Sequence, residues 1–113
     1  MAERPKLFKI DDEMRRWCAL LEQEVSAWPD VSAKPMFGMI GFYHRETIFA
    51  AIPRTRAMNT ARSVLIKLSG VRDKRLKRTS GPGAAWMTFE LQSPNDINEA
   101  LRWLERAYEQ KSP

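Results

Sequence analysis

The chain of 113 residues has one cysteine, Cys18, and one histidine, His44. A single cysteine excludes a disulfide within the chain. With so few thiol and imidazole groups there is no cluster at metal-ligand spacing, and no glycine-rich phosphate loop or nucleophile–base pair is present. We therefore expect no catalytic motif, no cofactor and no metal site.

Long apolar runs are also missing. No run approaches the ~18 residues that can span a bilayer, and residues 1–6 lack the apolar segment of a secretion signal. We expect a cytoplasmic protein without membrane segments. Cys18 lies among apolar residues of a predicted helix, so we expect its thiol to act as a small buried group.

The remaining composition is that of an ordinary globular domain, with 43% hydrophobic and 29% charged residues. We predict a flexible N-terminal arm over residues 1–10 and a single domain over residues 11–113. The first helix begins at Asp11 or Asp12, because a short carboxylate caps the free N–H groups of the first turn. Apolar residues then recur at helical spacing until Pro29 ends the helix.

Four segments after this helix have the pattern of strands, and a capping sequence at Ser93-Pro94 starts a last amphipathic helix. The connections at 54–62 and 71–80 are predicted to be loops or short helical turns. The expected fold is α+β, with a mostly antiparallel sheet of about four strands and both helices packed on one face. The predicted strands cover residues 36–43, 47–52, 63–68 and 85–91.

The first predicted strand contains two glycines, Gly38 and Gly41. Glycine within a strand marks a bulge, a bend, or a place where another group comes close. A helix that packs tightly over the sheet and the close approach of a ligand are both open explanations.

Several short segments share the pattern of a known family. They are Met36-Phe37-Gly38 leading into Gly41-Phe42-Tyr43, then Ile48-Phe49-Ala50, Leu65-Ile66-Lys67-Leu68, Ala85-Trp86-Met87-Thr88-Phe89 and Leu101-Arg102-Trp103-Leu104. Through them, residues 35–110 resemble the N-terminal domain of the competence regulator TfoX. The last strand is also similar to a Gly-Trp-Val-Thr-Phe strand in a small family named luciferase domain, which is the alternative relative.

The resemblance to TfoX implies an α+β sheet covered by helices, in a bacterial cytoplasmic protein with a regulatory or unknown role. It carries over no catalytic residue. The chain departs from the family pattern in two ways: the connection at 71–80 is basic where members are more acidic or mixed, and we expect no C-terminal helix-hairpin domain.

Positive charge is concentrated in the middle of the chain. Residues 45–78 contain ten basic and two acidic residues, a net charge of +8, whereas the rest contains nine basic and twelve acidic residues. Cations that neutralise phosphates bind nucleic acid in a salt-dependent way, and a nearby aromatic ring can stack on unpaired bases. The alternative is an ordinary solvated surface. The predicted binding site consists of Arg72, Lys74, Arg75, Lys77, Arg78 and Trp86.

We therefore predict a non-catalytic regulatory or partner-binding domain that takes nucleic acid or another acidic partner. Two other interpretations stay open. An enzyme or small-ligand-binding domain would depend on His44, but a hairpin tip is a wet and mobile place for acid–base chemistry. A homodimer would suit Trp103, which falls off the apolar stripe of its helix, because aromatic residues are enriched at interfaces.

Overall fold

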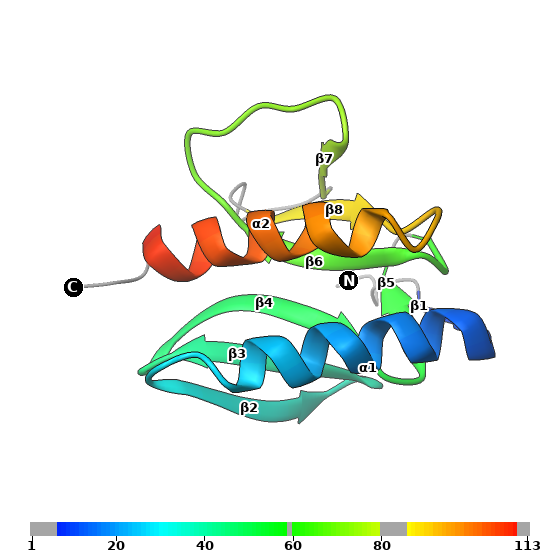
Figure 1. Ribbon diagram of the computed structural model, residues 1–113, viewed down its shortest axis with the longest axis horizontal. Helices are drawn as coiled ribbons and strands as arrows, with labels where there is room; N and C mark the ends of the chain where they lie inside the picture. Colours follow the sequence, from blue (N-terminus) through cyan, green and yellow to red (C-terminus); the bar gives the residue numbers. More distant parts are fainter. Residues whose placement is uncertain (1–6, 59, 80–85, 111–113) are drawn as a thin grey trace, which may run out of the picture.

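The computed structural model describes residues 7–58, 60–79 and 86–110 and is shown in Figure 1. Two helices lie over a sheet whose strands come mostly from the middle of the chain. In chain order the elements are β1 (Leu7–Lys9), α1 (Asp12–Ser26), β2 (Val31–Met36), β3 (Met39–His44), β4 (Thr47–Pro53), β5 (Arg56–Met58), β6 (Ser63–Lys67), β7 (Leu76–Arg78), β8 (Trp86–Glu90) and α2 (Asp96–Gln110).

The strands form one sheet of six, in the order β2-β3-β4-β6-β8-β7, and a separate pair, β1-β5. All described strand pairs are antiparallel. The α+β class and the antiparallel sheet are thus confirmed, whereas the predicted number of strands was too low. The two helices lie on the same face of the larger sheet (Figure 1).

Helix α1 begins as the sequence predicts. The Asp11 side chain accepts a hydrogen bond from the Met14 N–H at 2.8 Å and so caps the first turn. The face of α1 that packs over β2 and β4 is apolar. Its buried residues are Met14, Trp17, Cys18, Leu21 and Val25.

Helix α2 is also capped by a carboxylate. Asp96 accepts from the N–H groups of Gln92 and Ser93 at 2.8 and 3.2 Å, which is the reach-back half of a capping box. The helix packs over β4 and β6 through Ala100, Leu104 and Ala107. Each helix has 15 residues, and neither is long and apolar enough to cross a bilayer within the described part of the chain.

A bulge in β4 explains why two consecutive residues both enter the main core. Phe42 is opposite Ala50, but Tyr43 is opposite Ile48, so Phe49 has no partner on β3. An extra residue in one strand bends it and turns two side chains to one side. Phe49 and Ala50 are both fully buried in the core under the helices.

The first predicted strand is in fact two strands joined by a turn at Phe37 and Gly38. These residues have φ angles of +51° and +76°, the left-handed values of a tight type I′ hairpin turn. The Gly38 carbonyl accepts N–H groups from the three residues after β4, so the turn is fixed against that segment. Gly41 is on β3, where an added Cβ would lie 2.8 Å from the Met36 sulfur, so the group that comes close there is a neighbouring side chain and not a helix.

Two predicted connections contain strands instead of helical turns. Residues 56–58 form β5 and residues 76–78 form β7. Of the predicted arm, residues 1–6 lie outside the described residues, but Leu7–Lys9 pair with β5 and Ile10 is buried at 2% exposure. The structure therefore places Leu7 to Ile10 in the folded domain and not in the arm.

The segment between β6 and β7, residues 68–75, crosses the sheet and is called the crossover loop below. Because β6 and β7 are both antiparallel to β8, they run parallel to each other, and the chain must return from one end of the sheet to the other between them. Val71 is buried in the main core, and Arg75 contacts α2. The crossover loop thus lies beside α2, at the edge of the sheet that β7 forms (Figure 1).

Candidate functional site

Two clefts border the crossover loop, and Asp73 lines both. The first, called the basic cleft, has a volume of about 520 Å³ and lies between the loop, β7 and β8. The second, called the α2 cleft, has a volume of about 410 Å³. The basic cleft is lined by Val71, Arg72, Asp73, Lys74, Leu76, Arg78 and Met87, and the α2 cleft by Asp73, Glu99, Arg102, Trp103 and Arg106.

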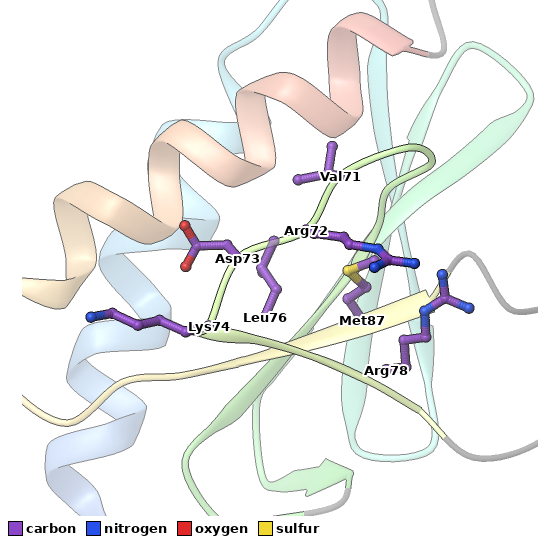
Figure 2. Close-up of a pocket in the computed structure, with 7 residues that line it drawn as sticks. All are labelled: Val71, Arg72, Asp73, Lys74, Leu76, Arg78 and Met87. Atoms are coloured by element: carbon purple, nitrogen blue, oxygen red, sulfur yellow. The ribbon is translucent and has the colours of Figure 1, made fainter.

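Arg72 and Arg78 are the cations that come together in the basic cleft. Figure 2 shows both side chains extending to the same side of the cleft, with the Met87 sulfur beside Arg72. Arg72 comes from the crossover loop and Arg78 from the end of β7, and both side chains are exposed. Neither forms an ion pair with any residue that the structure describes. The two guanidinium groups are therefore available to an anion.

Arg75, from the same loop, is fully engaged. Its guanidinium lies 3.2 Å from Asp96 and 3.6 Å from Glu99, donates to the Glu90 carbonyl at 2.9 Å, and covers the Phe89 ring. Its hydrogen bond to Asp96 raises the pKa of Arg75 and lowers that of Asp96. Arg75 therefore fastens the crossover loop to α2 and β8.

The other three predicted site residues are spread over different sides. Lys74 lines the basic cleft but extends away from Arg72 and Arg78 (Figure 2). Lys77 alternates with Leu76 and Arg78 along β7, so its side chain is on the helix-free face of the sheet. Trp86 is also on that face, half-buried against a small second core of Met39, Ala51 and Leu65. Trp86 thus does not stand beside the basic cleft as a stacking platform.

Three further arginines of the basic span have acidic partners. Each pair joins segments that are distant in the sequence, which is a common use of surface arginine. The pairs are Arg45 with Asp30 at 3.6 Å, Arg54 with Glu22 at 2.6 Å, and Arg62 with both Asp11 at 2.9 Å and Glu13 at 3.1 Å.

Trp103 lies at the edge of the packing, half-buried against the main core, and lines the α2 cleft. Its Nε1–H donates to Glu99 at 3.3 Å, and the Arg106 guanidinium lies 5.7 Å from its ring centre. Arg102 and Arg106 were missed by the sequence analysis, although their spacing of four places them on one helix face. The homodimer predicted through Trp103 stays a prediction.

His44 is not on a wet hairpin tip, contrary to expectation. It is 5% exposed, its Nδ1 donates to the Tyr108 carbonyl at 3.0 Å, and the two rings stack with centres 4.1 Å apart. Cys18 is buried as predicted, and burial raises the pKa of its thiol to about 12. This thiol is a poor nucleophile at neutral pH.

No group of three or more histidine, cysteine or acidic side chains among the described residues is arranged to hold a metal ion. Chemically, the basic cleft can bind an anion through two guanidinium groups above a small apolar lining. Compared with known proteins, the chain has no significant match to any family model, curated sequence or solved structure.

Proposed function

We propose that this protein is a non-catalytic binding module that takes an anionic partner in the basic cleft, with a regulatory role of the kind that the resemblance to TfoX implies. The observation that supports it most is the pair formed by Arg72 and Arg78. Their guanidinium groups share one cleft and have no carboxylate partner among the described residues.

Two like charges that face the same space repel each other, and an anion placed between them removes the repulsion. Guanidinium groups bind carboxylate and phosphate with two parallel hydrogen bonds, which adds geometric selectivity to charge. The different surroundings of a neighbouring arginine support this assignment. Arg75, in the same loop, is occupied by Asp96 and Glu99 and has no guanidinium left for a ligand.

Retention on immobilised heparin, a polyanion, tests the proposal. Replacing both Arg72 and Arg78 with glutamine should lower the salt concentration needed for elution, because polyanion binding depends on each neutralised charge. The matched control is Arg15→Gln with Arg16→Gln. It removes two exposed charges from α1, which packs over the other half of the sheet, and should elute close to wild type. Equal shifts for both double variants would contradict the proposal, because net charge would then explain the retention.

A further inference from the structure

We infer that the anionic partner is a single-stranded nucleic acid that lies across both clefts, with phosphates at Arg72 and Arg78 and a base at Trp103. This inference rests on the proposed function and names its partner. Neither the TfoX resemblance nor the charge run in the sequence assigns residues of α2 to binding.

The two clefts form one surface. Asp73 lines both of them, so the crossover loop is the ridge between the basic cleft and the α2 cleft. The cations therefore do not end at the basic cleft but continue onto the exposed side of α2. A flexible strand with a charge on every unit can follow such a track, whereas a compact anion would occupy one cleft alone. The exposed cations along the two clefts are Arg72, Lys74, Arg78, Arg102 and Arg106.

The two acidic residues that line the clefts offset only part of this charge, because two carboxylates face five cations. The Asp73 carboxylate accepts the Arg75 backbone N–H at 2.9 Å. Glu99 lies 3.6 Å from the Arg75 guanidinium and accepts the Trp103 indole N–H. Both carboxylates thus have partners within the fold, while the five cations have no acidic partner among the described residues.

The position of Trp103 in the α2 cleft favours a nucleic acid over an acidic protein segment as the partner. Its ring lines the α2 cleft together with Arg102 and Arg106, and the Arg106 guanidinium already lies near the ring. Aromatic rings interleaved with cations are typical of surfaces that bind single strands, where bases stack and phosphates pair. An acidic peptide would use the cations but would gain little from the ring. A duplex keeps its bases stacked inside, so a single strand fits better.

Fluorescence anisotropy with a labelled oligothymidylate of about 12 nucleotides measures this binding. The logarithm of affinity should fall with the logarithm of salt concentration. Each arginine that contacts a phosphate should contribute about 0.7 to the slope. Arg72→Gln with Arg78→Gln should reduce the slope by about 1.4, and Arg102→Gln with Arg106→Gln should also reduce it. Arg15→Gln with Arg16→Gln should leave it unchanged.

A second probe isolates the stacked base. An abasic oligonucleotide of the same length carries the same phosphates without bases. Wild type should bind the oligothymidylate at least about five-fold more tightly than the abasic strand. Trp103→Leu, which keeps an apolar group against the core, should lose this preference, while the arginine variants should weaken binding to both strands equally. If Trp103→Leu disturbs the packing of α2, the double variant Arg102→Gln with Arg106→Gln still tests the inference, because both arginines are exposed.

Polyglutamate separates failure of this inference from failure of the proposed function. Binding of polyglutamate that requires Arg72 and Arg78, with no preference of the protein for bases over abasic strand, would overturn the nucleic-acid inference and leave the anion-binding proposal standing. If every probe binds equally well to wild type and to the variant without Arg72 and Arg78, both the nucleic-acid inference and the anion-binding proposal are overturned.

Discussion

Arg72 and Arg75 are three residues apart, yet their guanidinium groups have opposite surroundings. Arg75 has two carboxylates, a carbonyl and an aromatic ring around it, whereas Arg72 faces an open cleft. A sequence shows the charge of both and the partners of neither. Residues of one type in one loop thus divide into a structural arginine and an available one.

This division predicts that the same substitution destabilises the fold at Arg75 and has little effect at Arg72. Arg75→Gln should lower the free energy of unfolding by about 1–2 kcal/mol, because charge-assisted hydrogen bonds to Asp96 and Glu90 are lost. Arg72→Gln should change it by less than about 0.5 kcal/mol, as expected for an exposed side chain without an ion-pair partner among the described residues. Urea denaturation measures both. Equal destabilisation would show that Arg72 has a structural role.

Asp96 gives the interaction with Arg75 a pH dependence. The Arg75 hydrogen bond is the main reason that the pKa of Asp96 lies below its ordinary value of 3.8. A carboxyl whose folded pKa is lowered contributes stability above its unfolded pKa and loses it as pH falls through the folded pKa. Asp96→Asn should therefore be less stable than wild type by about 1 kcal/mol at pH 7, with the difference shrinking below about pH 4. Urea denaturation midpoints of wild type and Asp96→Asn, measured at pH 7 and below about pH 4, test this. A difference in stability that is the same at both would argue against a charge effect.

At the scale of elements, the turn between β2 and β3 is the feature that the sequence conceals best. The run from Met36 to Tyr43 is apolar throughout, so the continuous apolar pattern predicts one strand there. The interruption comes from Phe37 and Gly38 in the left-handed region, and a phenylalanine gives no turn signal. Phe37 is 70% exposed, so little burial offsets its strained backbone.

The turn predicts a pair of changes with opposite sign. Phe37→Asn should raise the free energy of unfolding by about 0.5–1 kcal/mol, because asparagine tolerates the left-handed region and Asn-Gly is the preferred type I′ pair. Gly38→Ala should lower it by at least about 1 kcal/mol, since the added Cβ would meet the Arg56 side chain at 2.7 Å at a φ of +76°. Thermal unfolding measures both, and a lower midpoint for Phe37→Asn would mean that the exposed ring stabilises the fold.

The short strands β1, β5 and β7 show why the remaining elements were missed. Each has three residues, too few for a periodic pattern to emerge. β1 depends on pairing with β5 from about 50 positions later, and β7 depends on pairing with β8. Long-range pairing of this kind overrides the local signals of Arg-rich segments, which resembled loops.

For the whole molecule, the class and the layers follow from periodicity. The amphipathic stripes of the two helices and the alternation of β6 and β8 identify which side chains meet in the core, and Phe42, Phe49 and Phe89 are all fully buried there. The candidate site was only partly predictable. The cations were visible in the sequence, but their convergence depends on β8 lying between β6 and β7, a topology that no local pattern encodes.

That strand order also sets when the site is completed during synthesis. A ribosome makes Arg72 and Arg78 before β8, the strand that separates β6 from β7, and before α2, which holds Arg75. A nascent chain that stops short of these segments carries every cation of the basic cleft without the walls that orient them. Capture of an anion at this cleft is therefore a property that the polypeptide acquires only after β8 and α2 have been synthesised.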